Sequence, residues 1–159
     1  MQERKIKMHF YNLIKDISSI KKTLLYVDMD GVIASYDLGK PYDFLNKRPL
    51  KSNIDKLYEI SKLPNIELHI FSICRKDIQI NEKNTWLNKH ASFFDINNRT
   101  IISKESNPNL ESKELKLNYL KSLSTDNQII LLDDDNEILK YIQSNLKNII
   151  LFQDSELID

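Results

Sequence analysis

Residues 24–33 read LLYVDMDGVI, an apolar run that ends in two aspartates and a glycine. Residues 24–27 are all apolar, which is typical of a strand buried on both faces of a parallel sheet. Side chains two residues apart on an extended chain point the same way, so Asp28 and Asp30 should meet where the strand leaves the core, and Gly31 permits a sharp turn there. Two adjacent carboxylates repel each other unless a cation or a shared proton relieves them. The stretch therefore predicts either a strand end that binds a hard cation such as Mg²⁺ or, since Asp and Gly are common in turns, a simple turn.

The composition predicts a single soluble globular domain. The chain has 159 residues, of which 41% are hydrophobic and 29% are charged, enough to bury a core. Lys plus Arg and Asp plus Glu number 23 each, so no overall field attracts nucleic acid or a membrane, and a small charged substrate is the better expectation. The single cysteine, Cys74, excludes an internal disulfide. Because no apolar run is long enough for a signal sequence or a membrane span, we expect a cytoplasmic protein. The sequence makes no prediction of its oligomeric state.

Around the first strand the sequence predicts a helix and a loop. Residues 1–22 place apolar side chains at helical spacing between basic ones, so we expect an amphipathic helix packed on the domain of residues 23–159, with binding of its basic face to anionic lipid as the alternative. Residues 34–50 are aromatic and interrupted by prolines, which indicates an irregular loop over the acidic strand end. Ser52 and Asp55 have the spacing of a capping box that opens the next helix.

The rest of the chain alternates between strand and helix patterns. Apolar runs predict strands at residues 66–73, 99–103, 129–132 and 149–152, and helical spacing predicts helices at about residues 80–90, 111–123 and 137–145. This alternation favours an α/β fold: a three-layer α/β/α Rossmann-like domain with a parallel five-stranded sheet. Ligands bind such sheets beyond the carboxyl ends of the strands. Asp28, Asp30, Ser72 and Asp134 all fall at that edge.

A second acidic cluster follows the expected strand at residues 129–132. It consists of Asp133, Asp134 and Asp135. These residues could simply cap the next helix, since Asp134 and Glu137 are spaced as a capping box. A cap and a metal ligand are compatible roles, however, and acidic clusters on two strand ends repel each other unless a cation joins them. The two clusters together therefore favour a metal site.

At this point the sequence resembles the haloacid dehalogenase-like (HAD-like) phosphatase superfamily over most of its length. The matching motifs are Asp28-Met29-Asp30-Gly31-Val32, Ser72, Lys113 and the pair Asp133-Asp134. A narrower likeness, in residues 71–72, 82–90 and 101–102, is to the cytosolic 5′(3′)-deoxyribonucleotidase branch. The interval between Asp30 and Ser72 is too short for the helical cap of that branch, so a HAD-like catalytic domain with at most a minimal cap is implied.

The resemblance implies a Mg²⁺-dependent phosphomonoester hydrolase. Asp28 would attack phosphorus to give an aspartyl phosphate, while Asp30 would protonate the leaving group and later activate water. Mg²⁺ would be bound by the Asp28 carboxylate, the Asp30 main-chain carbonyl and Asp134. Ser72 would donate a hydrogen bond to the transferring oxygens, and Lys113 would neutralise them.

Several assignments stay open at the level of sequence. Lys104 and Lys116 rival Lys113 for the phosphate-neutralising role, although Lys113 is preferred because it begins the helix before the acidic strand. Either Asp133 or Asp134 could be the direct metal ligand. Arg75, just past the end of the strand at residues 66–73, could hold a second anionic group of the substrate or be a solvated loop residue.

The sequence also leaves the substrate and the functional class open. A small phosphorylated metabolite or nucleotide is favoured. A polynucleotide end-phosphatase acting on 3′-phosphorylated ends is the alternative, because a short cap leaves a site open to bulky substrates. A non-catalytic phosphate-binding relative and a phospho-receiver signalling domain are the other classes. A receiver predicts an acceptor aspartate after the third strand, where residues 100–103 read TIIS.

Overall fold

Five parallel strands form the central sheet of the computed structural model, which describes residues 9–158. They are β1 (Thr23–Val27), β2 (Ile66–Cys74), β3 (Arg99–Ser103), β4 (Gln128–Asp133) and β5 (Ile149–Gln153). Their order across the sheet is β3-β2-β1-β4-β5, and every neighbouring pair is parallel. The predicted parallel five-stranded sheet is confirmed.

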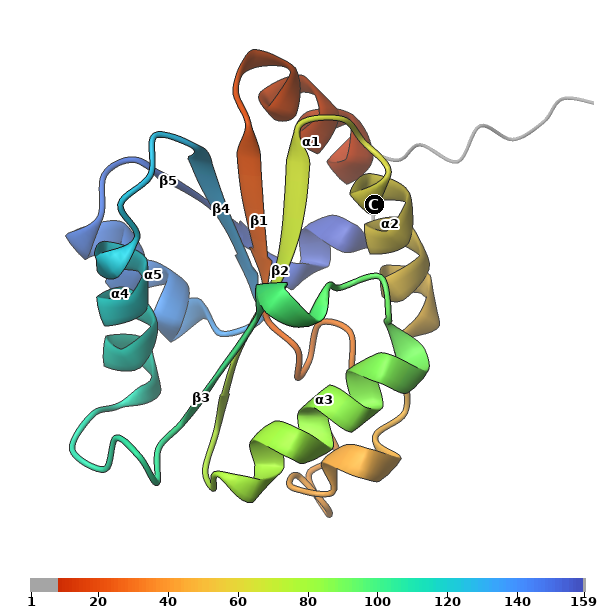
Figure 1. Ribbon diagram of the computed structural model, residues 1–159, viewed down its shortest axis with the longest axis vertical. Coiled ribbons are helices and arrows are strands. Elements are labelled where there is room, and N and C mark those ends of the chain that lie inside the picture. The colour runs from red at the N-terminus through yellow and green to blue at the C-terminus, as the bar shows by residue number, and fades with distance from the viewer. Residues whose placement is uncertain (1–8, 159) are drawn as a thin grey trace, which may run out of the picture.

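Helices cover both faces of this sheet (Figure 1). They are α1 (His9–Ile20), α2 (Lys51–Ser61), α3 (Ile78–His90), α4 (Ser112–Ser122) and α5 (Asn136–Asn145), with short 3₁₀ turns η1 (Phe44–Asn46), η2 (Ile96–Asn98) and η3 (Asp154–Leu157). Apolar side chains of α1, α2, α3 and η3 pack in one core, and those of α4 and α5 pack in a second core on the other face. The predicted three-layer α/β/α Rossmann-like architecture is confirmed.

The central strand β1 contributes alternately to these two cores. Leu25 and Val27 pack with the layer of α1, α2 and α3, whereas Leu24 and Tyr26 pack with the layer of α4 and α5. All four side chains are buried, which explains the unbroken apolar run of a central parallel strand. Asp28 continues the alternation of Leu24 and Tyr26, so its side chain emerges toward the α4 side of the sheet.

The N-terminal helix and the start of α2 can be compared with the sequence expectation. The described part of the expected N-terminal helix begins at His9, buries Phe10 and Ile14, and contacts α2, while residues 1–8 lie outside the described residues. The capping box expected from Ser52 and Asp55 is wrong, because α2 begins at Lys51 and no side chain caps it. The backbone N–H of Leu50, the residue before α2, instead donates to the carbonyl of Ile33 at 2.8 Å, which holds the chain against the loop after β1.

The strand order reverses between β1 and β4. Chain order runs outward from β1 through β2 to β3, and then resumes on the other side of β1 with β4 and β5. Such a switch point leaves a crevice between the carboxyl ends of the two strands, which is where α/β sheets bind ligands. Within residues 9–158, no helix is both long and apolar enough to cross a bilayer.

Candidate active site at the carboxyl ends of β1 and β4

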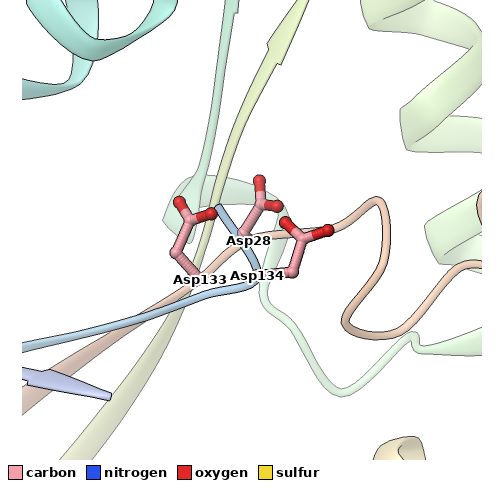
Figure 2. A group of neighbouring side chains, drawn as sticks. All are labelled: Asp28, Asp133 and Asp134. Atoms are coloured by element: carbon pink, nitrogen blue, oxygen red, sulfur yellow. The ribbon is translucent and has the colours of Figure 1, made fainter. Parts of the chain in front are cut away.

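The two acidic clusters meet at the switch point. The backbone N–H of Asp28 donates to the carbonyl of Leu132 at 2.9 Å, so β4 extends alongside β1 as far as Asp28 and Asp133. One carboxylate oxygen from each of Asp28, Asp133 and Asp134 lies within 4.8 Å of the others. Figure 2 shows the three carboxylates turned toward the same side. The expectation that Asp28 and Asp134 lie together at the sheet edge therefore agrees with the geometry.

Gly31 makes this approach sterically feasible. Its φ of 81° lies in the left-handed region that side chains disfavour. A Cβ atom at this position would lie 2.0 Å from Oδ2 of Asp134, which is closer than atoms in contact can be. The glycine therefore permits both the turn after Asp30 and the entry of Asp134 into the cluster.

Lys116 supplies the positive charge of the acidic cluster. This lysine projects from α4, is 2% exposed, and places its Nζ 3.0 Å from Oδ1 of Asp28 and 2.5 Å from Oδ2 of Asp133. Burial opposes the charge of the ammonium group, but the two carboxylates outweigh burial and raise the pKa of Lys116. Lys116 thus joins the strand ends β1 and β4 from the helical layer above them.

One lysine does not neutralise three aspartates. Burial, and then the charge of Asp133, raises the pKa of Asp28 well above its ordinary value, even though Lys116 lowers it. Burial also raises the pKa of Asp134 to about 6, although a hydrogen bond with Asp28 opposes that shift. Without a cation, the cluster is therefore biased toward holding a proton, whereas a cation would favour its fully ionised form.

The donor set fits a hard divalent cation. Carboxylate oxygens are the ligands that Mg²⁺ prefers in proteins. Both carboxylate oxygens of Asp133 already accept hydrogen bonds, Oδ1 from the backbone N–H of Asp135 at 3.0 Å and Oδ2 from Lys116. The carboxylate of Asp134 accepts from neither of these two donors. Asp28 and Asp134 would therefore be the better direct ligands of a bound cation, and Asp133 is suited to orienting Lys116.

The third aspartate of the second cluster has a different role. Asp135 is the N-cap of α5, where its side chain accepts hydrogen bonds from the backbone N–H groups of Glu137 and Ile138. The expected capping box of Asp134 and Glu137 is therefore wrong: the N-cap lies one residue later, and Ile138 at the third helical position cannot complete a capping box. Because Asp135 caps the helix, Asp134 is left to face the cluster.

Asp30 occupies a different electrostatic environment from Asp28. Its Oδ1 accepts a hydrogen bond from Lys47 at 2.9 Å, and its Oδ2 accepts one from Lys83 at 2.7 Å. Both lysine side chains are almost completely buried, and their Nζ atoms lie 4.8 and 4.5 Å from the centre of the Phe44 ring. Asp30 is thus held between two ammonium groups.

Lys83 also connects Asp30 to Ser72. Its Nζ donates to Oγ of Ser72 at 2.7 Å and to the carbonyl of Ile73 at 3.1 Å. Ser72 is 1% exposed. The serine hydroxyl is therefore covered by Lys83, and it reaches Asp30 through that lysine.

A cavity of about 590 Å³ opens over these groups, which we call the aspartate pocket. The charged residues in its lining are Asp28, Asp30, Lys116, Asp133, Asp134 and Asp135. The volume is within the range of about 300–1,000 Å³ that is usual for small-molecule sites. A small charged substrate can therefore reach both aspartates of the first motif.

The structure brings Lys116, and not Lys113, to Asp28. Lys113 lies on the outer side of α4, where its Nζ is 3.1 Å from Glu137 and 3.5 Å from Glu111. The preference for Lys113 is therefore corrected by the geometry. Lys113, in the first turn of α4, faces the neighbouring helix α5, whereas Lys116, three residues later, faces the sheet. Lys104, the other rival, lines an adjoining pocket.

A helical wheel of residues 111–123 indicates which lysine of α4 faces the sheet. The residues expected to form the apolar face of α4 are Leu115, Tyr119, Leu120 and Leu123. At 100° per residue, Lys116 falls about 30° from the centre of their arc and Lys113 about 90° from it. The angular position of a lysine was therefore a better guide than its place in the first turn.

Lys47 and Lys83 are site residues that the sequence reasoning did not identify. Lys83 stands three residues before Trp86 and four before Leu87, both buried, so its spacing alone places it on the inner face of α3. Lys47 follows η1 in an irregular loop, where no periodicity applies. Its carbonyl accepts a hydrogen bond from the indole Nε1 of Trp86 at 2.8 Å, a contact that fixes the loop on α3.

Comparisons with known proteins support the fold and assign no family. No protein-family model and no curated protein matches the chain. A chain in the structure of a Pnkp1/Rnl/Hen1 complex is similar to it with a TM-score of 0.63 and 15% sequence identity. The match covers 84% of this chain and 46% of the other, so this chain spans about half the length of that neighbour. At this identity the likeness establishes a shared fold only.

Proposed function

We propose that this protein is a Mg²⁺-dependent phosphomonoester hydrolase that acts through an aspartyl phosphate on Asp28. The observation that carries the proposal is the convergence of Asp28, Asp134 and Lys116 from β1, the end of β4 and α4 on one pocket at the switch point. A buried acidic cluster that one lysine leaves uncompensated is costly for a purely structural site. The order of motifs along the chain, which resembles the HAD-like superfamily, supports the same function.

In the first step, a carboxylate oxygen of Asp28 attacks phosphorus and the bond between phosphorus and the leaving alkoxide breaks. Asp30 enters this step protonated and gives its proton to that alkoxide, which leaves as an alcohol, so that Asp30 becomes the anionic carboxylate that the second step uses. Both aspartates line the aspartate pocket, so a single ester can contact both. Lys116, 3.0 Å from Asp28, is placed to stabilise negative charge on the transferring oxygens.

In the second step, a water molecule attacks the phosphorus of the aspartyl phosphate. Asp30 takes a proton from this water, the bond between phosphorus and Asp28 breaks, and inorganic phosphate leaves. The contacts from Lys47 and Lys83 at 2.9 and 2.7 Å suit the anionic carboxylate that this step requires. Ser72 is buried under Lys83 and does not line the aspartate pocket, so it would support the site by accepting a hydrogen bond from that lysine and not by contacting the phosphate.

Mg²⁺ would be held by the carboxylates of Asp28 and Asp134 and by the main-chain carbonyl of Asp30, where it would screen charge between the nucleophile and the phosphate. Burial and neighbouring aspartates raise the pKa values of Asp28 and Asp134. A cation beside these two carboxylates would therefore favour the ionised, nucleophilic form of Asp28.

The proposal is tested by hydrolysis of a panel of phosphorylated metabolites, nucleotides and 3′-phosphorylated oligonucleotides, with Mg²⁺ and with a chelator. We expect phosphate release that requires Mg²⁺ and is lost in Asp28→Asn. A protein that binds these compounds without releasing phosphate would instead be the non-catalytic phosphate-binding relative.

A polynucleotide end-phosphatase is the second candidate, and the size of the loop after β1 favours it. Residues 34–50 contain only the short turn η1, and the side chains of Tyr36 and Leu38 are 58% and 86% exposed. A receiver-like signalling domain is disfavoured, since such domains share the flavodoxin-like strand order 2-1-3-4-5 and this sheet has the order 3-2-1-4-5.

A further inference from the structure

A second cavity, of about 310 Å³, adjoins the aspartate pocket on its Asp30 side. The two cavities share Asp30, Tyr36, Ile73 and Ser112 in their linings. Under the proposed function, the phosphate of a substrate lies at Asp28 and its leaving oxygen faces Asp30. The alcohol part of the substrate therefore points into this second cavity, which we call the leaving-group pocket.

The leaving-group pocket has aromatic walls. Tyr36 and Tyr42 are 58% and 49% exposed and Phe44 is buried beside them. The guanidinium group of Arg75 lies 4.8 Å from the centre of the Tyr42 ring, an arrangement that holds both side chains in place. Together they present flat surfaces on which a planar ring can stack.

The pocket also has two cations that the fold does not neutralise. Arg75 and Lys104 both line it, and within residues 9–158 neither has a carboxylate oxygen at salt-bridge distance. The acid in the lining, Asp30, already accepts from Lys47 and Lys83. Glu105, which follows Lys104, accepts a hydrogen bond from the backbone of Asp77. The outer wall is therefore positive, in contrast to the aspartate pocket.

We propose that the leaving-group pocket binds a planar ring together with a second phosphate group, which Arg75 and Lys104 contact. This inference rests on the proposed function and specifies its substrate as a phosphomonoester that carries another phosphate. The second phosphate has two sources with the same chemistry: a free terminal phosphate, as in a nucleoside bisphosphate, or a phosphodiester next to a phosphorylated end. An arginine contacts either through paired N–H donors.

The test compares adenosine 3′,5′-bisphosphate with the two matching monophosphates in the presence of Mg²⁺. Turnover with the wild-type chain should show a KM for the bisphosphate at least about tenfold lower, since one charge-assisted contact is worth about 1.4 kcal/mol or more. Arg75→Gln and Lys104→Gln should each lower the ratio of kcat/KM for bisphosphate over monophosphate, chiefly through KM. Lys76→Gln is the matched control, because Lys76 is the exposed neighbour of Arg75 and does not line the pocket; its ratio should equal that of the wild type.

A second arm identifies the source of the phosphate. A 3′-phosphorylated dinucleotide that matches the bisphosphate in KM assigns the subsite to a phosphodiester, and one that matches the monophosphates assigns it to a terminal phosphate. Equal KM values for all substrates, or equal losses on mono- and bisphosphate in Arg75→Gln, would overturn the proposal.

Binding to the Asp28→Asn variant separates this inference from the proposed function. Calorimetric titration with the bisphosphate needs no turnover. If the chain hydrolyses none of the compounds but Arg75→Gln still weakens bisphosphate binding about tenfold relative to Lys76→Gln, the subsite stands and the hydrolase assignment fails. If hydrolysis occurs with no preference for a second phosphate, the hydrolase stands and the subsite fails.

Discussion

Asp28 and Asp30 belong to one motif and are separated by a single residue, yet the fold gives them opposite surroundings. Asp28 shares one lysine, Lys116, with Asp133 and lies beside a further acid. Asp30 lies outside that acidic cluster, and its carboxylate accepts hydrogen bonds from two lysines, Lys47 and Lys83. The acidic side of the site is thus short of positive charge, and the other side is well supplied with it.

This difference teaches that the motif Asp-x-Asp does not by itself define two equivalent acids. The partners of each carboxylate come from different elements: α4 provides the lysine beside Asp28, whereas α3 and the loop after β1 provide those beside Asp30. The cation-poor side is suited to binding a metal ion. The cation-rich side is suited to stabilising an anionic base.

The largest expected effect is on Asp28. Replacing it in Asp28→Asn should lower turnover about a thousandfold or more on every substrate, because no phosphoryl transfer begins without the nucleophile. Thermal stability without Mg²⁺ should stay level or rise, since the change removes one of several crowded charges. The measurements are steady-state turnover and a melting curve; turnover within tenfold of the parent would refute the assignment.

The second largest effect is the difference between Lys116→Met and Lys113→Met in turnover and in the free energy of unfolding. Lys116→Met should lower turnover by about a hundredfold, as for the loss of one donor to the transferring oxygens. It should also lower the free energy of unfolding by about 3–5 kcal/mol, because it leaves two aspartates unpaired in the interior. Lys113→Met removes a solvent-accessible ion pair and should change the free energy of unfolding far less than Lys116→Met does.

Turnover and urea titration of both variants check this contrast, with circular dichroism to establish that each is folded. Equal effects of the two substitutions would contradict the placement of Lys116 as the lysine of the site.

The next effect distinguishes Asp30 from a turn residue. Asp30→Asn should lower turnover about a hundredfold on an alkyl phosphate and much less on an aryl phosphate, because an aryl oxide needs little protonation to leave. Asp28→Asn should lower both alike. The ratio of the two turnovers is the measurement, and an Asp30→Asn ratio equal to that of the parent would show that Asp30 donates no proton.

The smallest effect is a dependence of stability on pH and Mg²⁺. The pKa of Asp134 is about 6 in the folded protein, above that of an unfolded chain near 3.9. The folded state therefore binds more protons than the unfolded state between these values, and the Asp134 contribution to stability falls as pH rises from about 4 to 6. The raised pKa of Asp28 acts in the same direction.

Mg²⁺ should raise the melting temperature by several degrees at pH 8, since a ligand at a hundred times its Kd stabilises by about 2.7 kcal/mol. The rise should be smaller at pH 5, where protons compete for the cluster. Asp134→Asn should reduce both the rise and its pH dependence, measured by calorimetry. An unaltered response would place the cation elsewhere.

The sheet and all five of its strands could be predicted from the sequence, because the apolar patterns that define them are local. The apolar run of β1 and the alternation of elements sufficed for the layers, and β3 was expected at residues 99–103, as observed. Periodicity also placed Asp28 and Asp134 at the same edge. Helix starts were less predictable: α2 is fixed by a backbone contact between Leu50 and Ile33, which no capping pattern reports.

The lysines of the site show where sequence reasoning ends. Lys83 and Lys116 could be found from their angle on a helix, because each lies among buried neighbours at helical spacing. Lys47 could not, since its position depends on how an irregular loop packs against Trp86. Which aspartate each lysine contacts is a long-range outcome of the packing of two helical layers.

Lys83 and Lys116 approach the sheet edge from opposite layers, α3 on one face and α4 on the other. Under the proposed function, catalysis would require both layers to be docked, and a state with the sheet and only one layer would be inert. Phosphatase activity would then report complete folding more sensitively than secondary structure does. In mild denaturant, detachment of α3 or α4 alone would abolish that activity while the sheet and the other helices persist.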